Sequence, residues 1–509
     1  MRPSPWIVAL FAPLLPSAQE LSWTDGVLGS GVTYTLSGDP SELWGLGVSL
    51  NSGPTPLAIV DPADPRFFDL GLELLPYWLF GSLSPAGEAT QTFFLPNTPM
   101  IVGVPLHAQF FTLPGATTFV DDISNDVSFA MQVPASTAQA VGERGGAIDG
   151  HSSTSLPDGS VLLAGGVDVA GGGDVALATL EVFDPQTQSF EPHSATLAAP
   201  RRAHTATLLT DGRVLLLGGR DGAGLATAAA ELFDPVAGTV TQVASMPQAR
   251  SQHTATLLAD GRVLVAGGVE LDDPADPITT LLSVLVSTAI YDPVLDAWSS
   301  GPELPAGRIG HAASLLDSGE VFVTGGIEVS SLFGFPTQDW TETCLLLDPA
   351  LGTALPTASM PGPRAYHAQV VLSTDGRVLV TGGARTGVFL EQVTLDEVVR
   401  YNPTLDVWAE LPTRLNQPRA YHALLETPTQ LAVIGGIAVI DSMALTETPE
   451  ASVELAPPDA STWAAPLAMQ LPRARVRASL VDGGERILVT GTGDDGGAGD
   501  DLSAEIVLP

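Results

Sequence analysis

One phrase recurs through most of this 509-residue chain: an apolar run, a tight turn, a second apolar run and a pair of glycines. The Gly-Gly pairs begin at 165, 218, 267, 325, 382 and 435, and a degenerate Gly-Thr pair stands at 491. Successive copies therefore lie 49 to 58 residues apart. Because a unit of this length cannot bury both faces of its own sheet, the copies must stack and share a core.

Each copy also has a consistent internal order. In the second copy "HTATLL" precedes Asp211-Gly212 and "RVLLLGG" follows it, which predicts two antiparallel strands joined by a two-residue turn with positive φ. A segment ending in Asp-Pro, such as "ELFDP" (231–235), predicts a third strand, and a segment with tryptophan, such as "DAW" (296–298), predicts a fourth. The last copy supplies only three strands, so we expect its outer strand to come from 128–141 and close the open edges.

The diglycine, the aromatic residue after it and the tryptophan near the end of the unit closely resemble the kelch family, from Arg144 to Pro509. This resemblance implies an all-β protein with a seven-bladed kelch β-propeller, four antiparallel strands to a blade. Six blades with a loose terminal unit is the alternative. The propeller domain is expected over 135–509.

The first part of the chain lacks the repeat. Over 19–134, short apolar stretches alternate with Gly, Pro and Asn turns, which predicts an antiparallel β-sandwich. This segment is similar to all-β modules of large secreted proteins of planctomycete-type bacteria. Before it, Arg2, an apolar run over 6–15 and Ser17-Ala18 predict a signal peptide over 1–18, cleaved near Ala18. The run is too short to span a bilayer, so we expect a protein that is secreted or held in the cell envelope.

Charge and cysteine content exclude several classes of partner and site. The chain has 57 acidic residues against 20 basic ones, none of them lysine, and a net charge of −37. Such a charge repels nucleic acid and anionic lipid, so neither is expected as a partner, and a neutral or cationic partner is favoured. The single cysteine, Cys344, excludes an internal disulfide and a CxxC zinc site. No membrane insertion is expected, and the protein is expected to be a monomer.

Residues that recur in every copy are expected to serve the fold. Six of the eight histidines occupy one repeat position, namely His151, His204, His253, His311, His367 and His422, and Ala478 is taken as its counterpart in the last copy. Arginine stands three positions earlier at Arg201, Arg250, Arg308, Arg364 and Arg419. Histidines spread one to a blade cannot converge on one metal ion, so we expect each to hydrogen-bond to a neighbouring blade. An arginine at the channel mouth would still bind an anion.

The position just before the histidine does vary between copies. It holds Gly150, Ala203, Gln252, Gly310, Tyr366, Tyr421 and, in the last copy, Arg477. Strand parity puts this position on the same face as three long variable loops, 269–288, 327–343 and 437–451. Loops on a rigid scaffold are where binding usually lies. The predicted ligand-binding face comprises Tyr366, Tyr421, Arg477, Gln252, Arg364 and Arg419.

A second resemblance offers an enzymatic alternative. Galactose oxidase and related copper-radical oxidases are secreted kelch propellers behind an N-terminal sandwich, and they carry a Tyr-His pair in the context R-x-Y-H. The resemblance implies copper ligands at Tyr366, His367, Tyr421 and His422. The family also needs a tyrosine cross-linked to cysteine and a histidine from a domain after the propeller. Cys344 is predicted in a buried strand, and no domain is expected after Pro509 to give that histidine.

The first interpretation is therefore a non-enzymatic exported binding protein without cofactor or metal. Its propeller would present the variable face to a protein or glycan ligand at or outside the cell surface. The copper-radical oxidase is the alternative, and a structural module of a cell-envelope assembly is the third. Motifs of other enzyme classes (GxSxG, HExxH and the P-loop) do not occur in the sequence.

Overall fold

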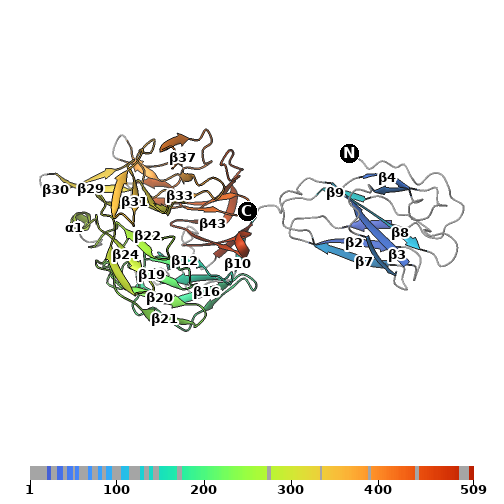
Figure 1. Cartoon of the computed structure of the whole chain (residues 1–509), viewed down its shortest axis with the longest axis horizontal. Coiled ribbons are helices and arrows are strands. Elements are labelled where there is room, and N and C mark those ends of the chain that lie inside the picture. Colours follow the sequence, from blue (N-terminus) through green and yellow to red (C-terminus); the bar gives the residue numbers. More distant parts are fainter. Residues whose placement is uncertain are drawn as a thin grey trace. The chain divides into compact units, whose positions relative to one another are not determined.

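The computed structural model describes the chain in two parts. Between residues 20 and 141 it describes the backbone of ten strands, without their side chains. From residue 148 it describes the chain except at 169–174, 272–276, 333–334, 388–390, 442–445, 492–503 and 509. The predicted signal peptide lies outside the described residues. The chain divides into two compact units, 1–135 and 136–509, each of which is considered by itself (Figure 1).

The described strands of the first unit pair antiparallel, in the orders β1-β2-β7, β6-β3-β8-β9 and β4-β5. They are β1 (Glu20–Trp23), β2 (Gly31–Ser37), β3 (Leu43–Ser49), β4 (Ser52–Pro56), β5 (Phe67–Leu70), β6 (Trp78–Ser82), β7 (Glu88–Phe94), β8 (Pro105–Leu113) and β9 (Val127–Ala130). The all-β nature of this unit agrees with the alternation of apolar stretches and turns in the sequence. The packing of these sheets into a sandwich stays a prediction.

In the second unit, four-stranded antiparallel sheets follow one another along the chain. In its described part, six sheets of this kind and one five-stranded sheet occur. The first three are β12 (Ser152–Ser155), β13 (Val161–Ala164), β16 (Leu180–Asp184), β17 (Ser189–Pro192); β18 (Thr205–Leu208), β19 (Val214–Leu217), β20 (Ala230–Asp234), β21 (Thr239–Gln242); and β22 (Thr254–Leu257), β23 (Val263–Ala266), β24 (Thr288–Asp292), β25 (Ala297–Ser300).

The next three sheets keep this order. They are β27 (Ala312–Leu315), β28 (Val321–Thr324), β31 (Cys344–Asp348), β32 (Thr353–Pro356); β33 (Ala368–Val371), β34 (Val378–Thr381), β37 (Val398–Asn402), β38 (Val407–Glu410); and β39 (Ala423–Glu426), β40 (Leu431–Ile434), β42 (Thr446–Ala456), β43 (Leu467–Arg473). The first strand of each sheet contacts the first strand of the next. The sheets therefore surround a common axis, as the ring of arrows in Figure 1 shows.

The last sheet joins the two ends of the unit. It contains β44 (Arg477–Val481), β45 (Arg486–Thr490), β46 (Ala504–Leu508) and, as its outer strand, β10 (Thr137–Val141). β10 pairs antiparallel with β46, and β44 contacts β12 of the first sheet, so the ring closes. The expectation that the missing strand comes from 128–141 is thus confirmed. This arrangement is a β-propeller, and closing the ring removes the exposed edges of the last sheet.

Short hairpins extend the loops between the second and third strands of several sheets. The first hairpin has β14 (Val167–Asp168), which also pairs with β11 (Ile148–Asp149), and β15 (Val175–Ala176). The second has β29 (Ile327–Leu332), which also pairs with β26 (Gly307–Ile309), and β30 (Phe335–Trp340). The others are β35 (Ala384–Thr386) with β36 (Gln392–Thr394), and β41 (Ile437–Asp441) with β42. Among the residues described, the helical segments are α1 (Pro277–Leu282) and a 3-10 turn (Asp482–Gly484). In the described part of the chain, no helix is long and apolar enough to cross a membrane.

The core lies between neighbouring sheets. The second strand of each sheet is buried along its length, as in "VLLL" of β19, because sheets cover both of its faces. Leu217 of β19 packs with Val265 of β23, and Leu216 packs with Leu162 of β13. Burying each such side chain contributes about 1.5–3 kcal/mol, so the sheets stabilise one another.

The hairpin between the first two strands differs from the sequence-based expectation. Leu209 and Arg213 pair at the base of the turn, which leaves a loop of three residues, and only Gly212 adopts a positive φ, of 87°. In the fifth sheet the base pair is Leu372 and Arg377, so that loop is one residue longer. The prediction of a two-residue turn was therefore wrong. A three-residue loop that ends on a left-handed glycine is also compatible with the Asp-Gly sequence.

Candidate ligand site at the channel mouth

The chain makes the same unusual turn just before the first strand of every sheet. Seven residues there have φ between 45° and 66°: Gly150, Ala203, Gln252, Gly310, Tyr366, Tyr421 and Arg475. The amide of Ala203 donates to the carbonyl of Gly150 (2.8 Å), and that of Tyr421 donates to the carbonyl of Tyr366 (2.9 Å). A left-handed φ costs a residue with a Cβ about 1–2 kcal/mol. The fold therefore imposes this backbone, whatever side chain the position carries.

In the last copy this turn falls at Arg475, whereas the sequence comparison placed it at Arg477. Arg473 makes the bonds of a repeat arginine there: it donates to the carbonyl of Gly491 (2.9 Å) and pairs with Glu505 (3.3 Å). Val476 then stands where the other copies have histidine, and the assignment of Ala478 to that position was wrong. The sequence "RARVR" allows both alignments, because a shift of two residues preserves strand parity.

The repeat histidines join neighbouring sheets, as expected from the sequence. Their Nε2 atoms lie in hydrogen-bond contact with a hydroxyl of the preceding sheet, at 3.0 Å between His253 and Thr205 and at 2.8 Å between His367 and Thr324. Burial, together with the charge of the neighbouring repeat arginines, lowers the pKa of His253 and His311 to about 3. These imidazoles are neutral bridges between sheets.

Two arginines of the predicted binding face lie inside the propeller. Arg364 donates to the carbonyl of Gly382 (3.2 Å) and pairs with Glu397 (3.1 Å). Arg419 bonds in the same way to the carbonyl of Gly435, and it pairs with Glu454 at 2.5 Å. Both arginines are fully buried. Contrary to the sequence-based expectation, they do not line the ligand-binding face, because their guanidinium groups bind a diglycine carbonyl and a glutamate carboxylate inside the propeller unit.

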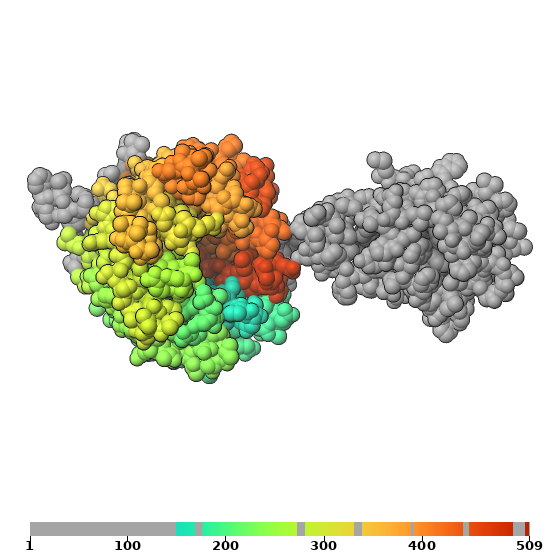
Figure 2. All heavy atoms as spheres, in the orientation of Figure 1, coloured from blue at the N-terminus to red at the C-terminus, as the bar shows by residue number. Residues whose placement is uncertain are grey.

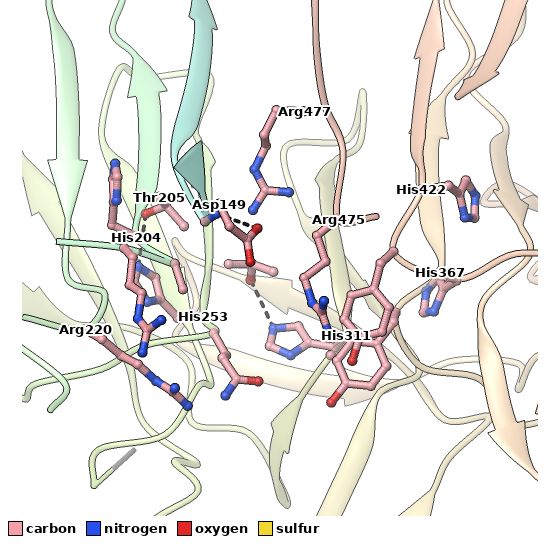
Figure 3. Close-up of a pocket in the computed structure, with 18 residues that line it drawn as sticks. Asp149, His204, Thr205, Arg220, His253, His311, His367, His422, Arg475 and Arg477 are labelled. Carbon is pink, nitrogen blue, oxygen red and sulfur yellow. Dashed lines mark hydrogen bonds between the residues drawn. The ribbon is translucent and has the colours of Figure 1, made fainter. Parts of the chain in front are cut away.

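The other four predicted residues share one cavity. A cavity of about 700 Å³ is lined by the residues of the left-handed turns and their neighbours, including Gln252, Tyr366, Tyr421 and Arg477 (Figure 3). Figure 2 shows a hollow at the centre of the propeller unit. We call this cavity, with its lining residues, the mouth cavity. Most of its lining comes from the turns before the first strands, which bring all seven sheets to one place.

The mouth cavity also contains charged residues that sequence comparison did not single out. They are Asp149, Arg202, Arg220 and Arg475. Arg202 and Arg220 face each other across a β-bridge, in which each amide donates to the other's carbonyl (3.0 and 2.8 Å). The same bridge is made in other copies by Ser251 and Val269, by Ala365 and Ala384, and by Ala420 and Ile437. Comparing the copies at this position would have revealed the two arginines.

Three side chains form a stack along one wall of the cavity. The rings of Tyr366 and Tyr421 are 4.2 Å apart and inclined by 19°, and the guanidinium carbon of Arg475 lies 5.1 Å from the centre of the Tyr421 ring. Trp340 meets Tyr366 edge-on at 6.1 Å. A Cβ on Gly310 would lie 2.7 Å from the Tyr366 ring, so this neighbour must be glycine. Burial, the adjacent Tyr366 and its hydrogen bond raise the pKa of Tyr421 well above 10.

Comparison with known proteins agrees with this architecture. The Kelch motif family model matches residues 201–247, which form the second sheet and its flanks. The chain is a kelch-repeat β-propeller protein. Kelch-like protein 33 of Homo sapiens is 33% identical over 149 residues, which cover 27% of this chain and 24% of the relative. Kelch-like protein terF of Aspergillus terreus is 28% identical over 228 residues, which cover 41% and 44%. The chain thus spans less than half the length of either relative.

A solved structure shares the fold of this kelch protein. A fungal alcohol oxidase of the AA5 family, in complex with copper, superimposes with a TM-score of 0.53 at 15% identity, over 71% of this chain and 74% of that one. At this identity the likeness shows the fold alone.

The Tyr-His pairs of this kelch protein already have partners within the propeller. His422 contacts Thr381 through Nε2 (2.8 Å), as His367 contacts Thr324, and the phenol of Tyr421 is held neutral. Cys344 packs in the core of the fourth and fifth sheets, where burial raises its pKa to about 12. In the part of the chain that is described, no three His, Cys, Asp or Glu side chains are grouped closely enough to hold a metal ion.

Proposed function

We propose that this chain is an exported, non-enzymatic binding protein whose kelch propeller presents the mouth cavity to a protein or glycan ligand. One observation carries the proposal. The residues that bond the sheets together recur from copy to copy, whereas the residues at the left-handed turns differ and converge on a cavity of about 700 Å³. This volume lies within the range of small-molecule and side-chain pockets.

The rigidity of the lining supports binding. A buried histidine follows six of the seven turns, and the buried Val476 follows the seventh, so the side chains at the cavity are held in place before a ligand arrives. Preorganised groups lose little conformational entropy on binding, which favours affinity. Export rests on the apolar segment at 6–15 and is tested by sequencing the N-terminus of the protein recovered from the medium or envelope.

The proposal is tested with a glycan array and a pull-down from envelope extract. We expect specific capture by the purified chain and at least a tenfold loss in the double variant Gln252→Ala, Tyr366→Ala, because both side chains line the cavity. The matched control is Gln242→Ala, an exposed residue of the outer strand β21, which should bind as the original does. Capture that survives the double variant would place the ligand elsewhere and overturn the proposal.

The copper-radical oxidase is the second candidate, because Tyr366, His367, Tyr421 and His422 all line the same cavity. It predicts stoichiometric copper after reconstitution, a tyrosyl-radical absorption band, and release of hydrogen peroxide, all lost on Tyr421→Phe. The binding proposal predicts none of these. Silence of both the array and the pull-down would instead favour the third role, a structural module of an envelope assembly.

A further inference from the structure

We infer that the mouth cavity recognises an anionic ligand, and specifically a sugar that carries a carboxylate, such as a uronic acid at the end of a glycan. This inference rests on the proposed function and adds the charge and chemical class of the ligand. Its basis is the arginine content of the cavity: Arg202, Arg220, Arg475 and Arg477 all line it.

The charge balance of the cavity is opposite to that of the whole chain. The chain has 57 acidic residues against 20 arginines, yet four arginines and a single carboxylate, Asp149, line this cavity. One of the four, Arg475, also pairs with Glu447 at 2.7 Å. The net charge alone favoured a neutral or cationic partner. Screening limits the reach of exposed charges to about 8 Å at physiological ionic strength, so the nearest groups decide what binds. At the cavity those groups are mainly cations (Figure 3).

The fold does not require the two arginines of the second copy. Arg202 and Arg220 stand directly opposite each other in a β-bridge, and like charges in that relation destabilise a sheet. At this bridge three other copies carry small or apolar pairs, so the propeller forms without charge there. In Figure 3 Arg220 lies on one side of Asp149, and Arg475 and Arg477 lie on the other. A bound anion would be held between the arginines of two different sheets.

Arg477 differs from the repeat arginines in its partners. Arg201, Arg419 and Arg473 each face a buried glutamate, which balances the charge inside the protein. Arg477 donates instead to the carbonyls of His151 (3.1 Å) and Val476 (3.3 Å), and within the described residues it makes no salt bridge. Burial lowers the pKa of Arg477, and the charge of Asp149 opposes this shift. A partly buried cation such as Arg477 gains from a paired anion, and a ligand carboxylate would supply one.

The remaining lining favours a hydroxyl-rich ligand over a flat apolar one. The aromatic faces are already covered, because Tyr366 and Tyr421 stack on each other and Arg475 lies over Tyr421. Gln252 offers an amide that both donates and accepts. The guanidinium fork matches the planar geometry of a carboxylate, which it binds through two parallel bonds. A sugar acid has hydroxyl groups for the amide of Gln252 and a carboxylate for the arginines.

The test is calorimetric titration of the full chain with glucuronic acid, with glucose as the neutral match and inorganic phosphate as the second anion. We expect glucuronate to bind at least tenfold more tightly than glucose or phosphate, and its affinity to fall as salt is raised. Phosphate binding as tight as that of glucuronate would overturn the assignment to a sugar. Equal binding of glucose and glucuronate would overturn the assignment of charge.

Two variants and one control localise the effect. Arg477→Gln and Arg220→Gln should each weaken glucuronate binding at least tenfold, the loss expected for one charge-assisted hydrogen bond. Arg220→Gln keeps the backbone bridge to Arg202, so it tests the charge even if Arg477→Gln loosens the bond to His151. Arg213→Gln is the matched control, because Arg213 lies on a solvent-exposed hairpin and pairs with Asp211 at 2.7 Å. Binding unchanged in both cavity variants would contradict the inference.

The glycan array separates this inference from the proposed function. Capture of neutral glycans, or of an acidic peptide in place of an acidic sugar, would overturn the inference and leave the binding role intact. A complete lack of capture in array, pull-down and titration would overturn both. Selective capture of uronate-terminated glycans, lost in Arg220→Gln, is the result expected.

Discussion

At the scale of single residues, the left-handed turn decides what each copy can place at the cavity. Glycine relieves the backbone strain of this turn at Gly150 and Gly310, whereas Gln252, Tyr366 and Tyr421 accept it. Residues held in such a conformation often belong to functional sites. The two tyrosines are therefore held in a strained backbone, at the place where the copies differ most.

Gly310→Ala tests this packing. The backbone at Gly310 has a φ of 63°, and a new Cβ would lie 2.7 Å from the Tyr366 ring. We therefore expect the free energy of unfolding to fall by more than the cost of the left-handed backbone alone, which is about 1–2 kcal/mol. The matched control is Gly319→Ala, with φ of 89° and open space around the Cβ, which should show only the backbone cost. Urea unfolding measures both. Equal losses would mean that Tyr366 is not fixed by its contact with Gly310.

The pH dependence of stability follows from the repeat histidines. Burial lowers the pKa of His253, His311 and His422 to about 3 in the folded chain, against about 6.5 when unfolded. The unfolded state therefore takes up protons that the folded state does not, so stability is greatest above pH 6.5 and falls as the pH drops from 6.5 towards 3. Each histidine contributes a slope of up to about 1.4 kcal/mol per pH unit.

Urea titrations at several pH values check this slope, which His422→Gln should reduce by up to one proton. His193→Gln, outside the row of repeat histidines, serves as control. A slope that is the same in both variants would show that the buried histidine does not contribute.

The sequence predicted the structural role of the recurring histidines correctly, but it did not predict the alignment of the last copy. Histidine bridges between sheets follow from their regular spacing, and the structure has them. The last copy was misaligned because three arginines alternate in "RARVR", and only the buried pair of Arg473 and Glu505 identifies the true register. Arg202 and Arg220 were overlooked because their partnership depends on a bridge between distant parts of the copy.

At the scale of the element, a repeat arginine holds each of the second to seventh sheets by bonding to the diglycine carbonyl of that sheet. Arg419 bonds to the carbonyls of Gly435 and Ser452 and pairs with Glu454, all inside the protein. The sequence predicted the four-strand order of the sheets from alternating apolar runs and turn residues. It did not predict the length of the first hairpin, since Asp-Gly is compatible with turns of two, three or four residues.

Arg419→Met is expected to cost about 3–5 kcal/mol of unfolding free energy, because it leaves the carboxylate of Glu454 buried without a cation. The double variant with Glu454→Gln should recover part of that loss. Arg414→Met is the control, since the exposed pair of Arg414 with Asp396 contributes about 0–1 kcal/mol. If Arg419→Met lowered the free energy of unfolding by less than about 1 kcal/mol, this arginine would not be a main stabilising residue of its sheet.

At the scale of the whole molecule, the net charge of the chain and the charge of the mouth cavity predict ligands of opposite charge. A net charge of −37 describes the protein from a distance, and it says nothing of a cavity that gathers four of the 20 arginines. The repeat period predicted the propeller because every copy must bury its sheet against the next. The ligand site could not be predicted as fully, because it depends on the few positions at which the copies disagree.

The pairing of β10 with β46 also determines when the propeller can complete its folding during synthesis. β10 comprises Thr137–Val141 and β46 comprises Ala504–Leu508, so almost the whole unit lies between the two partners. On a ribosome that adds about 5–20 residues each second, the earlier sheets are exposed well before the strand that completes the ring emerges. Until β46 has been synthesised, β10 has no partner strand in its sheet, and the propeller ring cannot close.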